Sequence, residues 1–169
     1  GRYSNDPPRI ELPELALDVL VASGLTAPFV PEFTSLARSA ADAAPRFAQT
    51  VLTLAVMVMS ASSLLLLILA PATVRLVAPG FDESSQELYL DLYRVMLVTP
   101  IIFGASITLG EVLVAERQFL YYALAPILYN LGIAGGTLLL HDRMGIMAAA
   151  VGAVIGATLH LGIRSVGMR

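Results

Sequence analysis

Hydrophobic and polar residues occur in long blocks along this chain rather than in short alternation. Four blocks are apolar and free of charge except near their ends: residues 47–74, 95–115, 118–140 and 144–163. As a helix that rises about 1.5 Å per residue, residues 118–140 would be roughly 34 Å long, enough to cross a hydrocarbon core of about 30 Å. The pattern therefore predicts four membrane-spanning helices.

A fifth block, residues 10–33, predicts a helix that cannot span a membrane alone, because only residues 19–30 of it are uncharged. Its acidic residues Glu11, Glu14 and Asp18 fall on one helical face. Such a face is either solvated on an interfacial helix or lines a cavity inside a helix bundle. Both interpretations stay open, and Asp18 is the candidate cavity residue.

The polar segments fit connections between antiparallel helices. Residues 1–9 are polar and Pro-rich, and we expect them to form a disordered stub. The others are expected to be a polar link at 34–46, an acidic loop at 75–94, and tight turns at 116–117 and 141–143. We expect an all-α, polytopic membrane helix bundle over residues 10–169.

Composition agrees with a membrane protein and excludes several other classes. Hydrophobic residues make up 57% of the chain, charged residues 14%, and the mean hydropathy of +0.78 lies outside the usual soluble range. A net charge of −3 without a basic stripe argues against a nucleic-acid partner. The chain has no Cys and begins with Gly, and we interpret it as a fragment that packs against the remaining helices of a longer protein.

All ten basic residues are Arg, and their distribution favours one orientation weakly. If Phe47 marks a cytoplasmic end, the inner segments contain five of them: Arg38, Arg46, Arg117, Arg164 and Arg169. The outer segments then contain three: Arg75, Arg94 and Arg143. The acidic 75–94 segment is accordingly expected outside.

Small residues recur at helical spacing in the last two blocks. Gly132 and Gly136 form a GxxxG motif, and Gly152 and Gly156 follow Ala148 at four-residue steps. Such stripes allow close helix packing in lipid. The second stripe continues in register to His160 and Arg164, which predicts that His160 faces protein rather than lipid.

Glu111 and His160 are the only titratable residues inside otherwise apolar blocks. Intramembrane ionisable groups usually face a cavity or a partner, but both residues lie near helix ends, where side chains also reach toward water. The sharper hypothesis is a Glu111–His160 contact that gates transport or couples it to protons.

Two prolines and one asparagine complete the candidate residues. Pro100 and Pro126 are either ordinary kinks or hinges, since a proline in a span frees a carbonyl that transporters often place at a substrate site. Asn130 either bonds to another helix or lines a cavity. We find no metal-ligand spacing, nucleophile motif, phosphate loop or dinucleotide fingerprint, so neither an enzyme nor a metal or other cofactor is expected.

Several short pieces occur in the order and spacing of one transporter family. They are Leu12-Pro13, Phe29-Val30-Pro31, Ala78-Pro79-Gly80-Phe81, residues 92–100, Phe119, Ala125-Pro126, Asn130, and Gly156 with His160, where the family commonly has Gln. On these pieces the chain resembles the MurJ/MviN lipid II flippases of the MOP exporter superfamily. The resemblance covers nearly all of residues 11–169 and implies the second to sixth helices of a 14-helix transporter.

The resemblance implies transport by alternating access in the bacterial inner membrane. The expected partners are membrane lipids and an undecaprenyl-pyrophosphate-linked disaccharide-pentapeptide. One departure concerns the substrate: Leu17, Asp18 and Ala22 stand where the family has a cavity-lining Arg pair and Glu. A divergent MOP exporter of another substrate and a non-transporting membrane scaffold are the alternatives.

Overall fold

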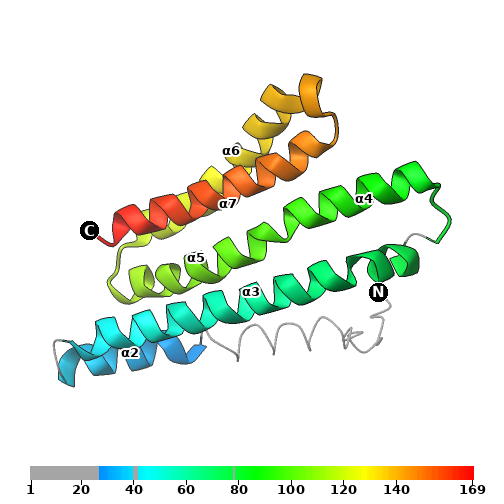
Figure 1. Ribbon diagram of the computed structural model, residues 1–169. Coiled ribbons are helices and arrows are strands. Elements are labelled where there is room, and N and C mark those ends of the chain that lie inside the picture. The colour runs from blue at the N-terminus through cyan, green and yellow to red at the C-terminus, as the bar shows by residue number, and fades with distance from the viewer. Residues whose placement is uncertain (1–26, 40–41, 78) are drawn as a thin grey trace, which may run out of the picture.

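The computed structural model describes residues 27–39, 42–77 and 79–169 (Figure 1). This part of the chain contains helices and no strand, which confirms the all-α fold class. The six helices are α2 (Ala27–Ser39), α3 (Ala43–Val77), α4 (Glu83–Met96), α5 (Val98–Ala115), α6 (Phe119–Met144) and α7 (Met147–Gly167).

Four helical segments are long and apolar enough to cross a membrane: Ala43–Leu76, Glu83–Ala115, Phe119–Met144 and Met147–Gly167. The second segment combines α4 and α5. Large apolar side chains are exposed along the spans, most continuously at residues 64–69 of α3. The described helices therefore form a multi-pass membrane bundle, as the hydrophobic blocks predicted.

The acidic segment 75–94 is not a loop, as the sequence had suggested, but is largely helical. Only residues 79–82 separate α3 from α4 within the described residues, and α4 then covers Glu83–Met96. Glu83 lies in its first turn and Arg94 in its last, where each charge complements the helix dipole. Clustered charge therefore marked a polar helix that continues the span of α5.

The start of α4 is also defined by a local hydrogen bond. The Ser84 hydroxyl donates to the Asp82 carboxylate at 2.5 Å. Hydrogen bonds from Ser84 and Ser85 lower the pKa of Asp82. Asp82 is thereby favoured in its charged form at the N-terminal end of α4, where a negative charge is stabilising.

Pro100 lies in the first turn of α5, directly after the break between α4 and α5 at Leu97. A proline at position 100 cannot donate a backbone hydrogen bond to the carbonyl of Met96. The Thr99 hydroxyl donates to this carbonyl instead, at 2.7 Å. The break is therefore a locally satisfied interruption of one long span.

Other helices extend beyond their predicted ends. α2 continues into the expected 34–46 link as far as Ser39, and α3 continues past Pro71 to Val77. α6 runs through the expected 141–143 turn and ends at Met144, directly before Gly145, whose φ of +55° suits glycine. Polar residues at these ends extend the helices out of the apolar blocks.

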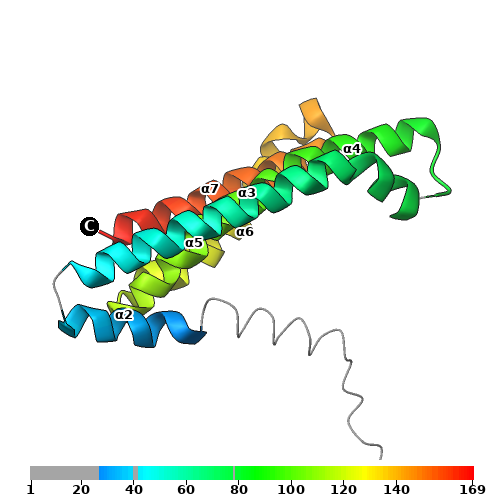
Figure 2. The same cartoon turned by 60° about the horizontal axis from the view of Figure 1, so that its bottom comes forward.

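Successive spans run antiparallel (Figure 1). α6 packs most extensively on α7, and α3 packs on α5. α2 lies at an angle beside the start of α3, as the rotated view shows (Figure 2). It contacts α3 and α5 through a cluster that includes Phe29, Phe33, Phe47 and Val112.

The α6–α7 contact is made at glycines. A Cβ atom on Gly132 would lie 2.3 Å from the Cα of Gly156, and one on Gly136 would lie 2.4 Å from the Cα of Gly152. These distances leave no room for a side chain, so the two backbones touch directly. The GxxxG motif and the second small stripe face each other.

Candidate functional site

Three of the buried polar side chains among the described residues lie together where α5 meets α7. Ser106 is completely buried, and His160 and Arg164 are each only 6% exposed. The Ser106 Oγ and the His160 Nδ1 lie 2.6 Å apart, within hydrogen-bond distance. One turn further along α7, the Arg164 Nη1 donates to the backbone carbonyl of Ser106 at 2.7 Å. Two side chains of α7 thus bind one residue of α5.

Aromatic rings enclose the imidazole of His160. The Phe103 ring of α5 lies edge-to-face with it at 5.1 Å between centroids, and the Tyr129 ring of α6 lies at 6.4 Å. Phe103 and Tyr129 also contact each other at 5.2 Å. Edge-to-face aromatic contacts are favourable, and both Ser106 and His160 are buried.

The guanidinium of Arg164 bridges α5, α6 and α7. Its Cζ lies 4.9 Å from the centroid of the Tyr122 ring on α6, a cation–π distance. On α5, a Cβ added to Gly110 would lie 2.4 Å from Nη1, so glycine makes room for the guanidinium. Among the described residues, its Nε has no hydrogen-bond partner.

Glu111 is half-buried on α5 near these groups but is not joined to them. Within the described residues it forms no ion pair with Arg164 inside 4.0 Å and no hydrogen bond with His160. The hypothesised Glu111–His160 contact is thus absent from this structure. The hydrogen-bond partner of His160 is Ser106.

The other predicted residues lie apart from this cluster. Asn130 is exposed on α6, and its side-chain amide donates to the carbonyl of Pro126 at 2.9 Å. Pro126 is also exposed, and Pro100 lies at the start of α5. Asp18 is outside the described residues, as are Leu17 and Ala22.

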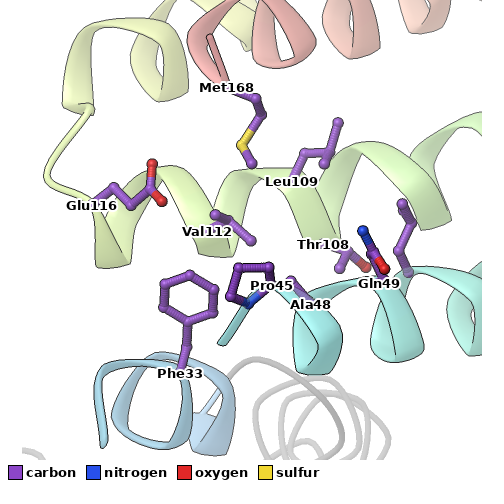
Figure 3. Close-up of a pocket in the computed structure, with 10 residues that line it drawn as sticks. Phe33, Pro45, Ala48, Gln49, Thr108, Leu109, Val112, Glu116 and Met168 are labelled. Carbon is purple, nitrogen blue, oxygen red and sulfur yellow. The ribbon is translucent and has the colours of Figure 1, made fainter. Parts of the chain in front are cut away.

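A separate cavity of about 170 Å³ lies between α2, α3 and α5 (Figure 3). Its walls are mainly apolar and include Phe33, Leu52, Val112 and Met168. Gln49, Thr108 and Glu116 add polar groups. Of the residues predicted as cavity-lining, the three that the structure describes, Glu111, Asn130 and His160, do not line it. Throughout the described part of the chain, His, Asp and Glu residues nowhere form a group of three able to hold a metal.

Sequence reasoning placed His160 on a protein-facing surface, with Arg164 in register on the same stripe, but missed Ser106 as their common partner. Arg164 is buried on the same face as His160. Ser106 carried no such signal. A serine hydroxyl in a span often bonds to its own helix, and only the packing of α5 against α7 shows the real partner.

Comparison with known protein families identifies the relatives of this bundle. A family model described as "Lipid II flippase MurJ" matches residues 10–168, nearly the whole chain. The chain belongs to the MurJ lipid II flippase family. Searches of curated proteins and of solved structures gave no match. The MurJ family is a family of membrane transporters, which agrees with four apolar spanning helices.

Proposed function

We propose that this chain helps to move lipid II across the bacterial inner membrane by alternating access. The observation that carries the proposal is the match to the MurJ family over residues 10–168. Moving a lipid-linked substrate between leaflets requires no covalent step. It requires a protected route for the polar head group and helices that can change their relative positions.

The described helices are suited to form one wall of such a route and to hold that wall in place. Their buried polar side chains are mostly engaged within the bundle, as at Ser106, His160 and Arg164. Apart from Arg164, the charged side chains of the described residues lie exposed or half-buried. We propose that contacts with the substrate pyrophosphate are made largely by other parts of the transporter.

Exposed apolar surface supports a role inside a larger bundle. Leu138 and Leu139 of α6 are 80% and 82% exposed, and residues 64–69 of α3 are exposed as a continuous run. In a membrane such surfaces contact either lipid tails or further helices. We propose that part of this surface packs against the remaining helices of the full-length transporter.

Complementation tests the proposed function. The full-length protein is expressed in a bacterium depleted of its own lipid II flippase, and growth and lysis are followed. We expect rescue. Lysis despite normal amounts of folded protein in the membrane would argue against lipid II as the substrate.

A second candidate is export of another substrate by the same mechanism. It is favoured by Asp18, which shares one predicted helical face with Glu11 and Glu14. Basic residues would bind an anionic pyrophosphate, whereas these acidic residues would repel it. Asp18→Arg in the full-length protein separates the two. If lipid II is the substrate, the variant keeps or improves rescue. Loss of transport of a cationic solute in the same variant would favour the second candidate.

A further inference from the structure

We propose that Ser106, His160 and Arg164 form a polar lock that fastens α5 to α7, so that α5, α6 and α7 move as one body during transport. The structural part of this proposal is independent of the substrate. The statement about movement rests on the proposed transport function.

Both bonds of the lock end on the same residue, Ser106. His160 engages the side chain of Ser106 at 2.6 Å, and Arg164 engages the backbone carbonyl of Ser106 at 2.7 Å. His160 and Arg164, the two residues of α7 that make these bonds, are one helical turn apart. Sliding α7 along α5, or rotating it about its axis, would therefore break both bonds at once and leave buried polar groups without partners.

These are the only side-chain hydrogen bonds that join two helices within the part of the chain that the structure describes. Side chains elsewhere on the described helices bond within their own segment, as Thr108 does to Gly104 and Thr137 to Ile133. α2 and α3 contact α5 through apolar packing. The polar attachment is thus confined to the α5–α7 junction.

α6 belongs to the same body through two further contacts. The Tyr122 ring lies under the Arg164 guanidinium at 4.9 Å, and the backbone of α6 touches that of α7 at Gly132 and Gly136. The surroundings of the lock residues are closely packed. A larger residue at position 110 would collide with Arg164, and the Phe103 and Tyr129 rings pack against His160. The chain therefore provides a polar bond and a closely fitting site at the same junction.

The test replaces the lock by a reversible covalent bridge. The sequence contains no Cys, so Ser106→Cys with His160→Cys introduces a unique pair where two side chains now meet, in the full-length protein cleared of any other cysteine. Each preparation is split, and one half is bridged with a short thiol cross-linker. Tm and lipid II transport in vesicles are measured for both halves, and the two single-cysteine variants receive the same treatment as controls.

The reduced pair is expected to melt at a lower temperature than the parent and to transport several-fold more slowly. Bridging should restore both values, because α5 and α7 need not separate. A bridged protein that is stable but inactive would overturn the proposal, since it would show that α5 and α7 move apart. A reduced pair with the Tm of the parent would overturn it as well.

A conservative variant distinguishes the bond from simple packing. His160→Asn places a polar atom near the position of Nδ1, where it can still bond to Ser106, and should keep most of the Tm of the parent. His160→Leu removes the bond and should lower the Tm. Equal Tm values for the two variants would contradict a hydrogen-bonded lock. If the parent moves no lipid II, the proposed function fails, but these Tm comparisons still decide whether the lock exists.

Discussion

At the scale of single residues, the buried arginine is the least expected feature of this bundle. A charged side chain inside a span is costly, and Arg164 has no carboxylate within ion-pair distance among the described residues. It is instead accommodated by a backbone carbonyl, an aromatic face and the missing side chain of Gly110. The space at Gly110 can be tested by substitution.

Gly110→Ala tests the space beside the guanidinium. The new methyl group would lie 2.4 Å from the Arg164 Nη1, so the guanidinium must shift. Because this nitrogen donates to the Ser106 carbonyl, the shift should weaken that bond, and we expect a loss of about 1–3 kcal/mol. The matched control is Gly162→Ala on α7, where a Cβ meets no atom within 4 Å. That change should be neutral or stabilise by up to about 1 kcal/mol. Thermal unfolding in detergent measures both, and equal Tm values would contradict this account of Arg164.

Gly156→Ala tests the direct contact of the α6 and α7 backbones. A Cβ at this position would lie 2.4 Å from the carbonyl oxygen of Tyr129, which cannot move without shifting α6. We expect a loss of about 1–3 kcal/mol. Gly135→Ala, which meets nothing within 4 Å, is the control on α6. If the Tm of Gly156→Ala is no lower than that of Gly135→Ala, the two helices are not in contact at this position.

The sequence predicts which face of α7 is buried but not which residue of α5 lies opposite it. The four-residue steps from Ala148 through Gly152 and Gly156 predicted which face of the helix is buried, and His160 lies on that face at 6% exposure. Periodicity specifies a face but not the residue opposite it. The pairing with Ser106 depends on the relative rotation and shift of α5 and α7, which neither helix encodes alone.

At the scale of elements, the apolar blocks located the four spans because hydrocarbon excludes charge over a fixed length. The helix ends were less predictable. Charged residues are compatible with both a loop and a solvated helix, so charge alone does not distinguish α4 from a loop. Hydropathy describes the membrane core, whereas helix length beyond it depends on capping and packing.

The α4–α5 break gives a prediction at this scale. Thr99→Val removes the hydroxyl that bonds the Met96 carbonyl and should cost about 1 kcal/mol. In a Pro100→Ala background the backbone N–H at position 100 can bond this carbonyl, so the same threonine change should cost much less. The four proteins form a double-mutant cycle measured by thermal unfolding. Additive effects would contradict the assignment of Thr99 as the substitute donor.

At the scale of the whole molecule, the arginine count predicts which end of the bundle faces the cytoplasm. The turn at Gly80 is expected outside and the α5–α6 connection inside. This sequence has no Cys, so in the full-length protein cleared of any other cysteine, Gly80→Cys and Gln118→Cys each introduce a single thiol. The two exposed positions lie at opposite ends of the α4–α5 span. In intact cells, a membrane-impermeant maleimide should label only the first. Labelling of only the second would reverse the orientation.

The described helices combine apolar outer surfaces with a polar junction between α5 and α7, and the family assigns the protein to transport. The most direct test of this account is lipid II movement by the purified full-length protein in sealed vesicles. Fluorescent lipid II is placed in one leaflet, and its appearance in the other is followed over time. We predict transfer well above that of protein-free vesicles. Transfer no faster than in protein-free vesicles, from a preparation with a sharp unfolding transition, would contradict the account.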